Sequence, residues 1–412
     1  MRFGRMLLAG WLVTAAVATV TPASAVDVPY TPASDSEVLE RLVVPRLAGT
    51  ASLAELRAHW AAQPTLVPAA LAYARAALEL NRREEDPRYL GYAERALRPW
   101  WERPDAPPEV MLLRASLRLA RMDYDDALRD LQSLIDSPAP EGHAARITRA
   151  GVRLSRGDPV GALADCKAAA PLVSPLVAVT CTAAARGLAG DATDGYAELD
   201  AALGASADAP LATELWARGV AADLALRLDR TSEARRHFEA AIQRMTAADT
   251  TDPGLLASYA DFLLDHGENK RALALLEPYM RQDTLLLRNT LAERAIGLTG
   301  EPLAAAAAEE HARRLVLRFQ EMRQRGDRSH LREQALFELS VRNDPAAALP
   351  LIAQSWTWQR EPIDARLYLR AALAAGRPDA ALPVLEWLRG TGLQDARLDR
   401  DIAAVRRQVP TR

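Results

Sequence analysis

Six arginines form the clearest chemical pattern in the sequence. They fall into two sets of three with the same spacing, one set 35 residues after the other: Arg114, Arg118 and Arg121, then Arg149, Arg153 and Arg156. At about 100° per residue, each set occupies one narrow strip of a helix that is otherwise apolar. Because a guanidinium can donate two hydrogen bonds to one carboxylate, we expect these strips to line a groove and to bind an acidic segment of a protein partner.

Aspartates that follow each arginine set support a second interpretation. They lie in the next predicted helix, at Asp125, Asp126, Asp130 and Asp165. An antiparallel neighbour would bring these carboxylates beside the guanidiniums, and the arginines would then form ion pairs within the chain. The sequence leaves both interpretations open.

The two cysteines suggest a disulfide. Cys166 lies one turn into a predicted helix, Cys181 lies early in the next one, and Pro171 and Pro175 mark the turn between them. Consecutive antiparallel helices bring such positions together, and an exported protein meets an oxidising compartment. Two buried free thiols are the alternative, because cysteine is a common core residue.

Other reactive side chains show no spacing typical of a site. We find no phosphate-binding loop and no zinc-protease or serine-hydrolase motif, and we predict no metal, no cofactor and no catalytic residue. Four clustered tryptophans could grip a sugar or an aromatic partner, although packing between helices explains them as well. They are Trp100, Trp101, Trp356 and Trp358. The histidines are scattered singly: His59, His143, His237, His266, His311 and His330.

Both arginine sets belong to a repeated unit that must position them. Residues 113–123 recur as 148–158, and each copy runs into a second helical segment, at 125–131 and 160–166. A helix, a tight turn and a second helix with a period in the mid-thirties are typical of a helical solenoid. The turn and the small residue after it return along the chain, so we predict eight or nine helix pairs. The later turns lie near Gly190, Asp229, Gly267, Gly300, Asn343 and Gly376.

This array resembles tetratricopeptide (TPR) repeats. The family has a small residue late in its first helix, Gly-Asp or similar at the turn, and alanine early in its second helix. The matching positions are Ala115, Met122-Asp123 and Ala127, then Ala150, Gly157-Asp158 and Ala162. Met111 and Arg118 stand where aromatic residues are usual, which leaves Sel1-like or other helix-pair repeats as alternatives. The resemblance implies an all-α, right-handed superhelical solenoid of antiparallel helix pairs, with a groove for other proteins and no catalytic residues.

The first 25 residues have the features of a signal peptide. Arg2 and Arg5 precede an apolar stretch at 6–20, and Ala23-Ser24-Ala25 forms a small-residue cleavage site. We expect the mature chain to begin at Val26 in the periplasm and to have no stable membrane insertion. The predicted order is a signal peptide at 1–25, a leader with capping helices at 26–65, the repeat array at 66–395 and a C-terminal cap at 396–412.

Composition narrows the function. The net charge of −3 becomes −5 when Arg2 and Arg5 leave with the signal peptide, which does not suggest a nucleic-acid binder. We therefore expect a non-catalytic periplasmic scaffold that binds proteins through a concave groove. A component of a cell-envelope assembly or polysaccharide-export machine is one alternative. An enzyme acting on the cell wall is another, but only a short tail after Leu393 remains for a catalytic module.

Overall fold

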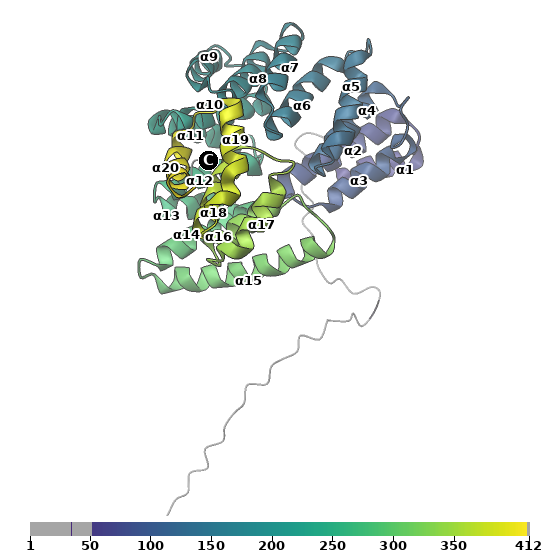
Figure 1. The fold of residues 1–412 in the computed structure, drawn as a ribbon. Helices are drawn as coiled ribbons and strands as arrows, with labels where there is room; N and C mark the ends of the chain where they lie inside the picture. The colour runs from purple at the N-terminus through teal and green to yellow at the C-terminus, as the bar shows by residue number, and fades with distance from the viewer. Residues whose placement is uncertain (1–33, 35–51, 410–412) are drawn as a thin grey trace, which may run out of the picture. The chain divides into compact units, whose positions relative to one another are not determined.

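The computed structural model describes residue 34 and residues 52–409. The predicted signal peptide, its cleavage site and nearly all of the leader lie outside the described residues. Every helix belongs to the second of two compact units, Arg46–Arg412. Within the described residues the unit has twenty α-helices and no strand (Figure 1).

Eighteen of these helices form nine consecutive pairs. The pairs are α2 (Val67–Glu84) with α3 (Arg88–Leu97), α4 (Pro108–Ala120) with α5 (Tyr124–Asp136), α6 (Gly142–Ser155) with α7 (Pro159–Ala169), α8 (Pro175–Leu188) with α9 (Ala192–Gly204), α10 (Leu211–Arg227) with α11 (Thr231–Ala247), α12 (Pro253–Asp265) with α13 (Asn269–Leu276), α14 (Asp283–Gly297) with α15 (Pro302–Gln324), α16 (Leu331–Ser340) with α17 (Pro345–Ser355), and α18 (Pro362–Ala374) with α19 (Leu382–Thr391). Helix α1 (Leu53–Ala62) precedes them and α20 (Ala396–Gln408) follows. The predicted all-α array of eight or nine helix pairs is confirmed.

The turn inside each of the nine pairs contains one residue in the left-handed conformation. Six turns share one backbone bond, in which the N–H after that residue donates to a carbonyl five positions earlier, as Asp158 N does to Arg153 O at 2.8 Å. This is the Schellman bond that ends a helix, and it explains why glycine or a short polar residue recurs there. The nine residues are Glu85, Met122, Gly157, Gly190, Asp229, Gly267, Gly300, Asn343 and Gly376.

In every pair after the first, a small residue near the start of the second helix lets the two helices approach closely. Ala127, Ala162, Ala234, Ala272, Ala348 and Ala381 occupy this place, and each is fully buried. The equivalent residue of α15, Ala305, lies 2.9 Å from the point where a Cβ on Gly297 would stand, so α14 and α15 also pack tightly. Ala305 is nevertheless exposed. On the side away from α14, Ala305 therefore has no helix of the described chain packed over it, unlike its buried counterparts.

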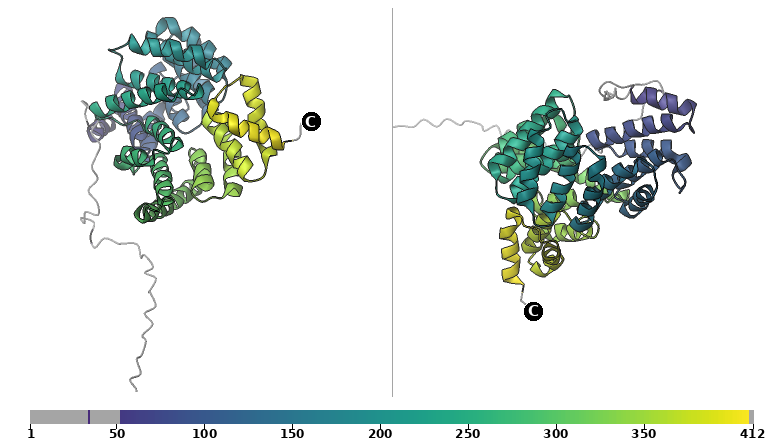
Figure 2. Two further views of the ribbon diagram at one scale, coloured as in Figure 1. Left: turned by 90° about the vertical axis from the view of Figure 1, so that its left-hand side faces the viewer. Right: turned by 90° about the horizontal axis from the view of Figure 1, so that it is seen from above.

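Segments far apart in the sequence also contact one another, so the array closes on itself. Near its start, Arg82 pairs with Asp252 at 3.0 Å. Near its end, the backbone N–H of Arg360 donates to Ser155 O at 2.7 Å, and helix α20 packs against α10. In Figures 1 and 2 the C-terminal helices, drawn in yellow, accordingly lie beside the teal helices of the middle repeats. The last repeats thus contact both the α6–α7 pair and the middle of the array.

Candidate functional site

Two arginines of the first set, Arg114 and Arg118, are held inside the protein by one carboxylate. Arg114 donates from Nε and Nη2 to Asp130 at 2.9 and 2.6 Å, and only 2% of the residue is exposed. Its Nη1 also donates to the carbonyl oxygens of Trp101 and Arg103, at 2.9 and 3.0 Å. Arg118 donates to the same Asp130 at 2.7 Å, and its guanidinium lies 5.4 Å from the centre of the Trp101 ring.

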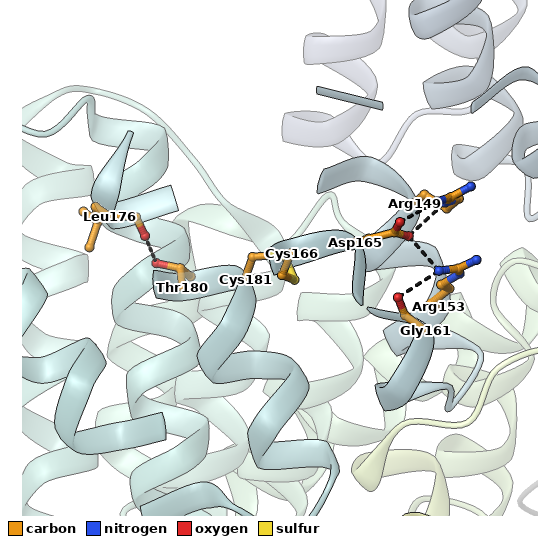
Figure 3. Close-up of a disulfide and its surroundings, with 8 residues drawn as sticks. All are labelled: Arg149, Arg153, Gly161, Asp165, Cys166, Leu176, Thr180 and Cys181. Carbon is orange, nitrogen blue, oxygen red and sulfur yellow. Dashed lines mark hydrogen bonds and ion pairs between the residues drawn. A yellow bond between two sulfur atoms is a disulfide. The ribbon is translucent and has the colours of Figure 1, made fainter. Parts of the chain in front are cut away.

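The second set repeats this arrangement one helix pair later. Arg149 donates from Nε and Nη2 to Asp165 at 2.8 and 2.5 Å. Arg153 donates to Asp165 at 2.9 Å and to the carbonyl of Gly161 at 2.8 Å. Figure 3 shows both guanidiniums meeting the Asp165 carboxylate, which is itself buried. Arg149 and Arg153 therefore join α6 to α7, as Arg114 and Arg118 join α4 to α5.

The prediction of an exposed basic strip is wrong for these arginines. Arg114, Arg118 and Arg149 are buried. Arg153 is partly exposed, but it forms an ion pair with Asp165, the same carboxylate that pairs with Arg149. The physical reason is that a guanidinium removed from water needs a carboxylate partner, and the helix-pair turn places one Asp opposite two Arg. Of the remaining two, Arg121 pairs with Glu94 and Arg156 with Asp125, and both keep more than a third of their side-chain surface exposed. A role in partner binding stays a prediction for Arg121 and Arg156 alone.

The cysteines join α7 to α8. The structure links Cys166 and Cys181 by a disulfide, with their Cα atoms 5.5 Å apart (Figure 3). Both residues are buried, and Cys166 follows Asp165 directly in the sequence. One turn of α7 therefore carries both the ion pair to α6 and the covalent link to α8. Oxidation of the pair in the exported protein stays a prediction.

Aromatic residues mainly pack between helices. Trp100 and Trp356 are buried, and the ring of Trp356 meets that of Trp387 edge to face at 5.3 Å. Trp358 is half-buried with its ring near Arg328, at 5.6 Å. The burial of Trp100 and Trp356 thus favours packing over a sugar-binding or aromatic-binding surface.

The described residues contain no group of three His, Cys, Asp or Glu side chains that could hold a metal. His237 is buried beside the Tyr196 hydroxyl, 3.3 Å from its Nε2, and His266 Nδ1 lies 2.7 Å from the carbonyl of Phe262. Burial, followed by the positive charge of Arg236, lowers the pKa of His237 to about 4.

A cavity of about 460 Å³ lies where the middle and last repeats meet. Its polar walls are ion pairs between those repeats: Arg397 reaches Asp223 at 2.8 Å, and Arg366 reaches Asp265 at 2.5 and 3.0 Å. Burial acts to raise the pKa of Asp223, but the charges and hydrogen bonds of Arg227 and Arg397 outweigh it and lower that pKa to about 2. These carboxylates act as fixed partners of arginine.

Asp261 is the exception in this cavity. Burial raises the pKa of its carboxyl, and the nearby Arg288 offsets the effect only in part. Arg288 donates to one of its oxygens at 2.8 Å. Asp223, Asp261 and Asp265 each accept hydrogen bonds from arginine, and these ion pairs hold neighbouring helices together.

A second hollow of about 450 Å³ lies on the outside, along α15, and the sequence reasoning missed it. The end of α14 supplies Arg294, Gly297 and Leu298 to its walls. The end of α16 and the turn after it supply Phe337, Val341 and Arg342. Helix α15 contributes a stripe of Ala305, Ala308, Glu309, Ala312, Arg313 and Val316. We name this set of twelve residues the α15 groove. The sequence signal that could have found it is the helical stretch at 302–324, which is longer than one repeat needs.

Among the comparisons with known proteins, the one with solved structures alone finds matches. Neither a protein-family model nor a curated protein matches the sequence. Solved structures do match, among them the crystal structure of the TPR domain of P58(IPK), with 16% sequence identity and a TM-score of 0.23. That match covers 81% of this chain and 98% of the other. No helix in the described ranges is long and apolar enough to cross a membrane.

The fold follows from the chain's own geometry. Nine helix pairs follow one another, and each pair turns through one left-handed residue. In eight of the pairs the residue five positions after it is small, and it is buried in every case except Ala305. The described chain is an all-α, TPR-like array of antiparallel helix pairs.

Proposed function

We propose that the protein is an exported, non-catalytic scaffold that binds other proteins. The observation that carries this proposal is the apolar surface at the α14–α15 turn. Leu298 and Leu303 are 80% and 87% exposed there, beside the α15 groove. Large apolar side chains gathered beside a groove are typical of protein interaction sites.

The arrangement of the cavity supports a non-catalytic role. A general base needs a carboxylate or imidazole that is free to accept a proton from a substrate. In the cavity, Asp223 and Asp265 instead each accept at least two hydrogen bonds from arginines. Their chemistry is that of structural ion pairs.

Export is supported by the order of charged, apolar and small residues in the first 25 positions. The oxidising periplasm would also favour the Cys166–Cys181 disulfide. Intact mass of the protein released from the periplasm tests this part, and we expect a chain that begins at Val26. A full-length mass in the membrane fraction would contradict it.

The scaffold role is tested by capture of partners. We would crosslink cells that produce the tagged protein, isolate the periplasmic contents and identify captured proteins by mass spectrometry. A tagged exported protein of unrelated fold serves as the control. We expect one or a few proteins in stoichiometric amounts with the scaffold alone. Recovery of the same proteins with the control would contradict the proposal, and a wall-hydrolysis assay on the purified protein tests the enzymatic alternative.

A further inference from the structure

The α15 groove exists because two successive helices differ in length. Helix α15 has 23 residues and α16 has 10, which correspond to lengths of about 34 and 15 Å at 1.5 Å per residue. The two helices meet near the C-terminal end of α15, where the rings of Phe319 and Phe337 lie 5.5 Å apart. Since α16 ends at Ser340, the N-terminal half of α15 extends beyond it.

The exposure of single residues follows this difference. The equivalents of Ala305 in six other second helices are fully buried, whereas Ala305 is exposed. Ala305 contacts α14 at Gly297 on one side, and Ala308, one turn later, is buried. The N-terminal half of α15 is therefore packed on one side and uncovered on the side where a longer α16 would run.

The uncovered side has the shape that accepts another helix. Ala305, Glu309, Ala312 and Val316 are spaced by four, three and four residues and so form one continuous stripe. Small side chains in such a stripe leave room for bulky side chains of a second helix, which interdigitate at axial distances of about 8–10 Å. The uncovered half of α15 is about 18 Å long, enough for a partner helix of about three turns.

The charged residues of the α15 groove favour a partner helix that carries carboxylates. Three arginines line it, against one carboxylate, Glu309. Arg294 forms no ion pair with any described residue, Arg342 reaches Glu338 at 3.2 Å, and Arg313 reaches Glu310 at 2.7 Å. A carboxylate that approaches Arg294 would thus gain a partner without breaking an existing pair.

We propose that the α15 groove binds an amphipathic helix of a partner protein, with bulky apolar residues against Ala305 and Ala312 and with Asp or Glu residues facing Arg294 and Arg342. The inference rests on the proposed scaffold function and names its binding surface. An acidic segment of a partner would then bind at the α15 groove, where arginines are accessible, and not at the buried arginines of the two sets.

The test uses helical peptides as probes. A displayed library of 16-residue amphipathic helices, with random residues on the apolar face and Glu, Gln or Lys on the flanks, is selected on the mature protein. Affinities of the enriched peptides are then measured by fluorescence anisotropy. We expect Leu-rich, Glu-flanked peptides to be enriched and to bind more weakly at raised salt. Failure to enrich any peptide, or enrichment of Lys-flanked peptides, would overturn the proposal.

Variants locate the site. Ala305→Trp fills the groove, and Ala306→Trp is a matched control because Ala306 is exposed on the same helix and does not line the groove. We expect about a tenfold loss of affinity for the first and little change for the second, as for a residue central to an interface. Arg294→Glu should weaken the Glu-flanked peptide by about tenfold and restore binding to its Lys-flanked version, whereas Arg129→Glu, on the exposed side of α5, should do neither. Equal binding by Ala305→Trp and Ala306→Trp would overturn the assignment.

Two further outcomes separate this proposal from others. If the wild-type protein dimerises in sedimentation and Ala305→Trp does not, a second copy of the chain occupies the groove and the partner helix is excluded. If the Ala305→Trp protein still captures the crosslinked partners of the wild type, the scaffold function stands and the groove assignment fails. If the wild type captures no partner at all, the scaffold function itself fails.

Discussion

The indole Nε1 of Trp387 donates a hydrogen bond of 3.1 Å to the carbonyl oxygen of Gly157, 230 positions earlier in the chain. Gly157 is the left-handed residue of the α6–α7 turn, with φ of +77°. The same residue thus ends one helix and receives a side chain from the last helix pair. The absence of a side chain on Gly157 permits the left-handed conformation and also leaves room for the Trp387 ring.

Replacement of Gly157 by alanine should therefore destabilise the protein more than the turn alone would require. A Cβ there would stand 2.4 Å from Trp387 Nε1, whereas a Cβ on Gly267, with φ of +72°, meets no atom of the described chain within 4 Å. We expect Gly267→Ala to lower the free energy of unfolding by about 1–2 kcal/mol, the usual cost of a left-handed alanine, and Gly157→Ala by about 3 kcal/mol or more. Urea unfolding measures both, and equal losses would contradict the proposed contact.

Removal of Asp130 should be among the most damaging single changes. Asp130→Ala leaves two buried guanidiniums, those of Arg114 and Arg118, without a carboxylate. We expect a loss of about 3–5 kcal/mol, as for a broken buried ion pair. Asp126→Ala is the control, because Asp126 pairs with Arg129 at the surface and should change stability by no more than about 0.5 kcal/mol. Similar melting temperatures for the two variants would show that the first arginine set is not held as described.

The disulfide should add to stability through the unfolded chain. It closes a loop between positions 15 residues apart, and simultaneous replacement of Cys166 and Cys181 by alanine should cost about 3 kcal/mol. Purified periplasmic protein, denatured without reductant, should resist alkylation of both thiols. Modification of both cysteines under that condition would contradict the oxidised state.

Acid should weaken the folded protein through His237. Its pKa is about 4 in the folded state, below the ordinary value of 6.5, because the imidazole is buried and lies near Arg236. Between these values the unfolded chain binds more protons, so this residue lowers stability as the pH falls from about 6.5 to 4, by roughly 3 kcal/mol in total. His237→Gln should flatten the dependence of the unfolding free energy on pH within that window. An unchanged dependence would show that the imidazole is reached by water.

Sequence patterns predict the local parts of this fold well. The turns were predictable because a left-handed residue favours glycine or a short polar side chain, as at Gly190 and Asn343. The internal pairing of arginines was also within reach. Arg114 and Asp130 are separated by 16 positions, and so are Arg149 and Asp165. This equal spacing favours a contact that is repeated within each helix pair over a shared external ligand.

The closure of the array and the α15 groove were beyond prediction. The contacts of Ser155 with Arg360 and of Asp223 with Arg397 join residue types that occur throughout the chain, so nothing marks these as partners. The exposure of Ala305 depends on where α16 ends in space, and its sequence context resembles that of its buried counterparts.

The contacts that join early and late repeats limit how this protein can evolve. In an open array, each unit touches only its neighbours, so units can be duplicated or lost one at a time. Here Gly157 and Trp387 fix the number of residues that must fit between them, and insertion of a helix pair between α8 and α17 would carry the two apart. Change in repeat number is then confined to the ends of the chain, and diversification must proceed through surface residues of a fixed set of nine pairs.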